Sequence, residues 1–108
     1  MASKRLFGRA DQRLSCEFTL EGRRHQGIAT DLSARGLFVQ ASVQPAQGCA
    51  IDLTLREDEA GEIPVRGNVV RVQGTHRAVS VVVPGGFGVS LDTASEAFFD
   101  LLVRLGLG

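Results

Sequence analysis

The chain of 108 residues has no tryptophan and no tyrosine, and it has only two cysteines and two histidines. Small barrels that bind single-stranded nucleic acid stack bases on exposed aromatic rings, so the missing ring types disfavour that function. Cys16 and Cys49 lie at apolar positions of alternating patterns, which predicts buried thiols rather than a disulfide or a redox pair. The scattered histidines lack the spacing of metal ligands, so we predict neither a metal site nor a cofactor.

An excess of charge of one sign is also lacking. The chain has 12 basic and 12 acidic side chains, whereas general nucleic-acid or membrane-surface binders need a broad basic face. No apolar run is long enough to cross a membrane, and the basic N-terminal residues lead to Gly8 and Asp11 rather than into a signal peptide. We therefore expect one cytoplasmic domain that does not insert into a membrane.

Arrangements typical of catalysis are missing as well. His25 and His76 lie on polar stretches near expected turns, and no serine or cysteine has the local pattern of an activated nucleophile. The carboxylates of residues 57–62 belong to an expected solvated turn and do not converge on a pocket. No enzymatic activity is predicted.

What the chain does contain is a series of short strand patterns. Apolar residues alternate with polar ones over residues 14–20, and similar patterns predict strands over about residues 24–31, 37–41, 51–56, 65–72, 78–83 and 87–91. The apolar phase changes at Val69 and Val70, which predicts a β-bulge there. Successive strands without intervening helices favour an all-β fold, a small antiparallel barrel of six to seven strands.

One helix is expected after the last strand. Thr93-Ala-Ser-Glu96 has the form of a capping box, with Thr93 as the N-cap, and predicts a helix over about residues 93–105. Its apolar stripe is expected to pack against the open end of the barrel and consists of Phe98, Leu101, Leu102 and Leu105.

Two short polar motifs indicate a binding site. Arg9 and Arg13, four residues apart, offer planar charged groups that can hold phosphate or the O6/N7 edge of guanine. In the second motif, Asp31 can accept hydrogen bonds from the N1 and N2 groups of guanine. Ser33 adds a small donor and acceptor, and Gly36 allows close approach to the backbone. Together the motifs predict a site for guanine and phosphate.

Both motifs, in this order and at about this separation, make the chain similar to the PilZ domain, a bacterial receptor module for cyclic di-GMP. The resemblance extends to Gly27-Ile-Ala-Thr-Asp-Leu-Ser-Ala-Arg-Gly-Leu-Phe-Val and to Gly86-Phe-Gly-Val-Ser-Leu, and so covers nearly the whole chain. It implies that Arg9, Arg13, Asp31, Ser33 and Gly36 bind cyclic di-GMP without turning it over. Motility and surface polysaccharide are outputs of relatives, and these residues do not distinguish between them.

The resemblance and the composition together suggest two parts. Residues 1–13 have no apolar period and are expected to form a flexible arm, whereas residues 14–108 form the barrel and its helix. Ligand would bridge the arm and the barrel, and the ordered arm would pass the signal to an effector protein that the sequence does not identify.

Several alternatives stay open. Arg5 and Arg9 have the same four-residue spacing, so Arg5 is a secondary candidate, as are Gly8 and Arg35. Gly8 replaces a residue that is often charged in relatives, which leaves open whether one ligand or a stacked pair binds. The second motif could be an ordinary turn, with its side chains bonded to nearby amides and a positive φ at the glycine. The domain could also be an adaptor that binds no nucleotide.

Overall fold

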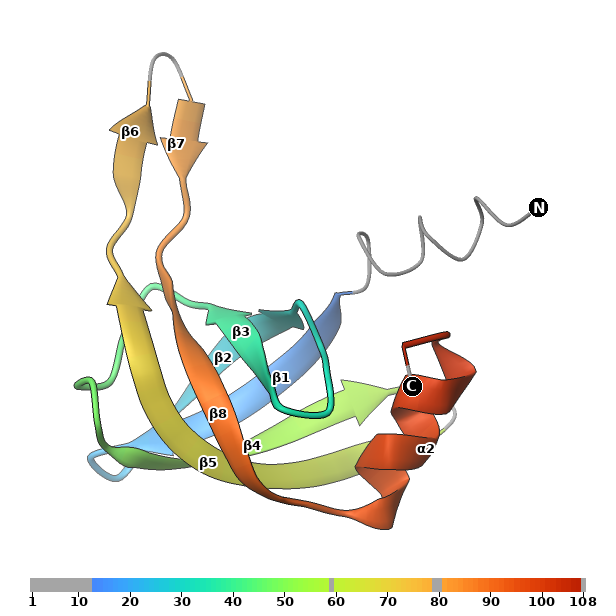
Figure 1. The fold of residues 1–108 in the computed structure, drawn as a ribbon. Helices are drawn as coiled ribbons and strands as arrows, with labels where there is room; N and C mark the ends of the chain where they lie inside the picture. The colour runs from blue at the N-terminus through green and yellow to red at the C-terminus, as the bar shows by residue number, and fades with distance from the viewer. Residues whose placement is uncertain (1–12, 59, 79–80, 108) are drawn as a thin grey trace.

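The structure, a computed structural model, describes residues 13–58, 60–78 and 81–107, with eight strands and a helix in that part of the chain (Figure 1). In chain order these are β1 (Leu14–Leu20), β2 (Arg23–Thr30), β3 (Gly36–Gln40), β4 (Ala50–Glu57), β5 (Gly61–Gln73), β6 (His76–Ala78), β7 (Val81–Val83), β8 (Gly86–Ala94) and α2 (Glu96–Arg104).

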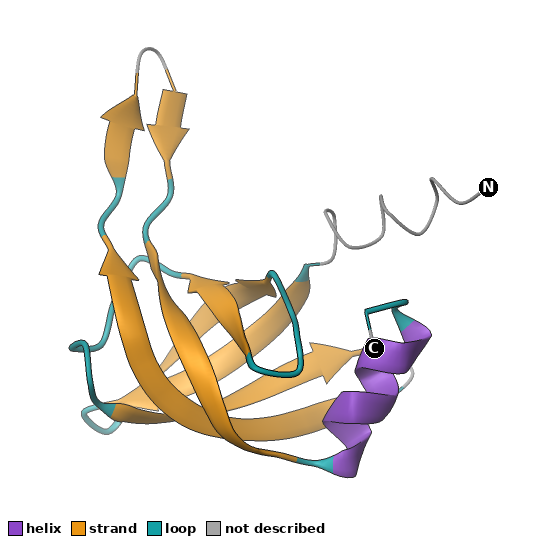
Figure 2. Cartoon of the chain, viewed as in Figure 1, coloured by secondary structure: helices purple, strands orange, loops and turns teal. Residues whose placement is uncertain are grey.

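Six of the strands form a closed antiparallel barrel in the order β1-β2-β3-β8-β5-β4. This confirms the predicted all-β barrel. β6 and β7 pair only with each other and project from the barrel as a ribbon beyond the ends of β5 and β8 (Figure 2). The prediction of a single strand over residues 78–83 was therefore wrong. That segment is apolar at nearly every position and has no alternation to mark where the chain reverses.

The core is formed by the inward-facing residues that the strand alternation predicted. Phe18 on β1 and Phe87 on β8 are buried and meet edge to face, with ring centroids 5.2 Å apart. Cys16 is fully buried as a free thiol, and its burial raises the pKa to about 11, so it stays protonated and packs as an apolar group at neutral pH. Cys49, also free, is half-buried against the same core.

The predicted bulge is present on β5. Val69 pairs with Val89 of β8 and Arg71 pairs with Gly88, so Val70 has no partner in the ladder. Before the bulge, alternate residues of β5 are buried from Ile63 to Val69; after it, Val70 and Arg71 are both exposed. The extra residue thus shifts the phase of the strand and turns Arg71 to the outer surface.

α2 packs beside the barrel as its apolar stripe predicts, because Phe98, Leu101 and Leu102 are buried and Leu105 lies half-buried against the core. The predicted N-cap was wrong, however. Ser95 caps the helix, and its side chain accepts a hydrogen bond from the Phe98 amide. Thr93 instead belongs to β8, where it pairs with Arg66 of β5. In the part of the chain that the structure describes, no helix has the length and apolar character needed to span a membrane.

This arrangement predicts different effects for the two hydroxyl residues. We expect Ser95→Ala to lower the free energy of unfolding by about 1 kcal/mol, because the cap to the Phe98 amide is lost. Thr93→Ala removes an exposed strand side chain and should change it by less than about 0.5 kcal/mol. Urea unfolding of both variants measures the difference. A larger loss for Thr93→Ala would contradict the assignment of the cap.

Candidate functional site

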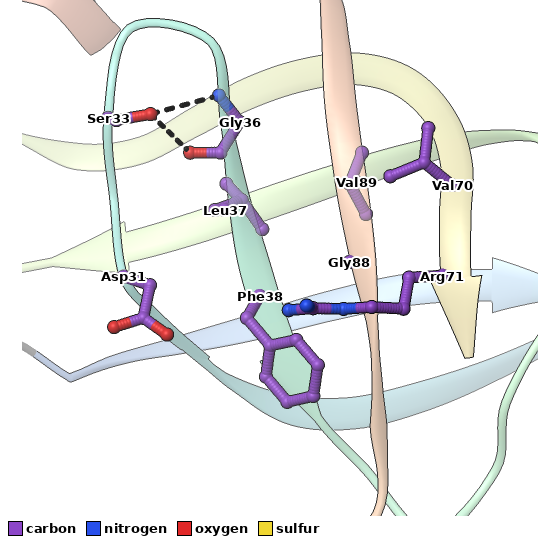
Figure 3. Close-up of a pocket in the computed structure, with 9 residues that line it drawn as sticks. All are labelled: Asp31, Ser33, Gly36, Leu37, Phe38, Val70, Arg71, Gly88 and Val89. Atoms are coloured by element: carbon purple, nitrogen blue, oxygen red, sulfur yellow. Dashed lines mark hydrogen bonds between the residues drawn. The ribbon is translucent and has the colours of Figure 1, made fainter. Parts of the chain in front are cut away.

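An open pocket of about 380 Å³ lies on the outer surface where β3, β8 and β5 run side by side (Figure 3). It brings together the three barrel residues that the second motif predicts, Asp31, Ser33 and Gly36. Its other lining residues come from the three strands and are Leu37, Phe38, Val70, Arg71, Gly88 and Val89.

Asp31 directly follows the last residue of β2 and has a left-handed backbone conformation, with φ of 52°. Aspartate and asparagine adopt this conformation more readily than other residues with a side chain. The reversal at Asp31 turns the chain out of the sheet, and the exposed carboxylate lines the pocket. The residue type therefore fits both the local backbone and an acceptor role in the pocket.

Ser33 holds the loop between β2 and β3. Its hydroxyl oxygen accepts hydrogen bonds from the backbone N–H groups of Arg35 and Gly36, both at 3.2 Å, and its hydroxyl donates to the Gly36 carbonyl. Its backbone N–H also donates to that carbonyl at 2.9 Å. The Ser33 hydroxyl thus makes the local hydrogen bonds that an ordinary turn would have. A contact with a ligand would add to these bonds or replace one of them.

Gly36 has a different role from the one that the turn alternative gives it. It does not have a positive φ; it begins β3 and pairs with Ser90 of β8. A Cβ at this position would collide with the Val89 carbonyl oxygen. Glycine is therefore required for the close approach of two strands, and this approach forms one wall of the pocket.

Of the arginines predicted from the sequence as ligand contacts, the structure describes Arg13 and Arg35. Arg13 is exposed directly before β1, whose first residue, Leu14, pairs with Ala29 near the end of β2. Arg13 thus lies near the same end of β2 as Asp31. Arg35 is exposed in the loop but does not line the pocket. The candidates Arg5, Gly8 and Arg9 lie outside the described residues.

The structure adds two residues that the sequence analysis missed. Arg71 lies with its guanidinium carbon 5.6 Å from the centroid of the Phe38 ring, and both line the pocket. The bulge at Val69 and Val70 was predicted, and it was the available signal that the following residue would face outward. The contact of Arg71 with Phe38 of β3 could not be inferred, because local periodicity does not show that β3 and β5 both pair with β8.

The described arginines differ in whether they pair with an acid. Arg56 forms ion pairs with Glu17 at 2.8 Å and with Glu62 at 3.0 Å. In contrast, Arg13 and Arg71 have no acidic partner among the described residues. In the described ranges, no three His, Cys, Asp or Glu side chains gather as a metal site would require. Arg71 therefore gives the pocket one unpaired cationic group for an anionic ligand, beside the acceptor Asp31.

Comparison with known proteins gives a consistent result. The sequence model of the PilZ domain matches residues 3–106. Among solved structures, the fold is similar to the "PilZ domain with c-di-GMP of YcgR from Escherichia coli", with a TM-score of 0.67 and 11% identity over 86% of this chain and 78% of that one. A search of curated proteins finds no significant match.

The close approach at Gly36 can be tested directly. We expect Gly36→Ala to lower the free energy of unfolding by about 1–3 kcal/mol, because its Cβ would press on the Val89 carbonyl oxygen. Gly74→Ala is the matched control, since a Cβ there meets nothing within 4 Å. Thermal and urea unfolding of both variants compare the two positions. Equal stability of the Gly36 and Gly74 variants would show that β3 and β8 do not approach this closely.

Proposed function

The chain belongs to the PilZ domain family, and from this membership we propose that it is a receptor for cyclic di-GMP. The observation that carries the proposal is the pocket, which gathers Asp31, Ser33 and Gly36 on one surface in the spacing of the family motif. The similar YcgR domain is described with c-di-GMP. Asp31 would accept from N1 and N2 of one guanine, and Ser33 would contact the same edge. Gly36 has no side chain and would leave room for the base in the pocket.

The positive charge for the phosphates would come from the N-terminal arm. Arg9 and Arg13 would hold phosphate and the O6/N7 edge of guanine, with Arg5, Gly8 and Arg35 as secondary contacts. The position of Arg13 supports this, because it directly precedes Leu14, which pairs with Ala29, two residues before Asp31. In this proposal, ligand orders residues 1–13 against the barrel and creates a surface for an effector protein in the cytoplasm.

Two alternatives are less well supported. An adaptor that binds no nucleotide would not need the acceptor Asp31 and the cation Arg71 in this pocket. A nucleic-acid barrel would need exposed rings in a row, but Phe18, Phe87 and Phe98 are all buried in the core. Catalysis is not part of the proposal, because the messenger would be bound and released unchanged.

We expect the purified domain to bind cyclic di-GMP, and to bind GMP and cyclic di-AMP much more weakly, as measured by isothermal titration. Asp31→Ala should lose at least about tenfold in affinity, since a hydrogen bond to a charged group contributes roughly 1.5–3 kcal/mol. Asp31→Asn should retain more, because its amide oxygen still accepts and the residue tolerates the backbone conformation. Asp58→Ala, an exposed carboxylate outside the pocket, is the control. Absence of binding by the unaltered domain would leave the adaptor alternative.

The same titration distinguishes the two overlapping arginine pairs. We expect Arg9→Ala and Arg13→Ala each to weaken binding of cyclic di-GMP by about tenfold or more, because each removes a charged fork from phosphate or guanine. Arg5→Ala should change the affinity by less than about threefold. Loss of binding in Arg5→Ala with binding kept in Arg13→Ala would assign the arm motif to the other pair.

A further inference from the structure

We propose that Arg71 is a stacking residue of this pocket, and that its guanidinium plane supports one purine base of the ligand. This inference rests on the proposed function and adds a contact that lies outside both sequence motifs. It assigns Arg71 a role through its flat shape rather than through its charge alone.

The first support is the way in which β5 aims the residue. Without the bulge, the alternation that buries Val65, Gly67 and Val69 would turn residue 71 into the core. With Val70 left unpaired, Arg71 pairs with Gly88 and points outward. Bulges re-aim side chains in this way beside functional sites. One of the two departures from regular pairing between β5 and β8 is therefore the one that places an arginine in the pocket.

The second support is the space that Gly88 provides. Phe38 of β3 and Arg71 of β5 both pair with Gly88, so the three residues form a line across neighbouring strands. A Cβ on Gly88 would already touch Arg71, with Cβ and Nε of the arginine at 3.6 Å. Because Gly88 has no side chain, the guanidinium crosses β8 and reaches Phe38, as Figure 3 shows.

The third support is the partner that holds the guanidinium. Its carbon lies 5.6 Å from the centroid of the half-buried Phe38 ring, which is the distance of a cation–π contact. Among the described residues no carboxylate pairs with it, and Asp31 lies apart from it at the other side of the pocket (Figure 3). An aromatic ring restrains the arginine while leaving its hydrogen-bond donors and charge uncompensated.

These features favour stacking over a simple charge contact. A guanidinium is planar and weakly hydrated, and bases stack on it as they do on aromatic rings. A lysine carries the same charge as a compact, strongly hydrated group and offers no plane. With Asp31 at the edge of the base and Arg71 against its face, the pocket would restrain one guanine in two directions. This would add a second flat group to the pocket beside the Phe38 ring, in a chain without tryptophan and tyrosine.

Two substitutions separate shape from charge. In titrations with cyclic di-GMP, we expect Arg71→Lys to weaken binding by about tenfold, the size of a lost base-stacking contact. Arg71→Tyr keeps a flat face without the charge and should stay within about threefold of the unaltered domain. Arg23→Lys, at an exposed arginine of β2 outside the pocket, is the control, and thermal unfolding checks that each variant is folded.

Two other outcomes would contradict the proposal. Binding retained by Arg71→Lys but lost by Arg71→Tyr would overturn stacking in favour of a phosphate contact. Unchanged binding in both variants would show that Arg71 does not touch the ligand. Either result leaves the receptor proposal intact, because the unaltered domain still binds; only its failure to bind cyclic di-GMP would remove the proposed function itself.

Discussion

The close packing of β8 between β3 and β5 is the constraint on which the rest of the structure depends. A Cβ at Gly36 would meet the Val89 carbonyl oxygen, and one at Gly67 would meet that of Ser90, so neither neighbouring strand can carry a side chain at these points. β8 thereby joins the two halves of the sheet and closes the barrel. Closure removes the free edges that a six-stranded sheet of this size would otherwise expose. The pocket lies on this same group of three strands, so barrel closure and site geometry have a common cause.

Irregularity along β5 and β8 gives this surface its chemistry. In a regular ladder, successive side chains of each strand point alternately into the core and out to solvent. The skipped Val70 on β5 instead turns two successive side chains outward, and Gly88 on β8 leaves the space that Arg71 occupies. Asp31 departs from regular geometry as well, with its left-handed backbone at the end of β2. The pocket is therefore built where the sheet deviates from its regular repeat.

Local sequence patterns predicted the features that depend on neighbouring residues. Alternation located β1 and its buried Cys16 and Phe18, and the phase change at Val69 located the bulge. Patterns failed where a competing interaction decided the outcome. Thr93 has a good capping sequence, but the ladder with Arg66 extends β8 past it and leaves the cap to Ser95. The pairing of Phe38 and Arg71 with Gly88 depends on which strands become neighbours, and no local period contains that information.

The neutral net charge of the chain is compatible with an anion site because the charges are unevenly paired. Arg56 of β4 and Arg66 of β5 lie against acids: Arg56 pairs with Glu17 at 2.8 Å, and Arg66 pairs with Asp52 at 3.1 Å. Such exposed pairs add little to stability, at most about 1 kcal/mol each, but they cancel the field of that face. Arg71 has no such partner among the described residues, so its charge stays available to a ligand in the pocket that it lines. The distribution of charge, rather than its sum, thus favours a small anion at this surface over a long polyanion wrapped around the barrel.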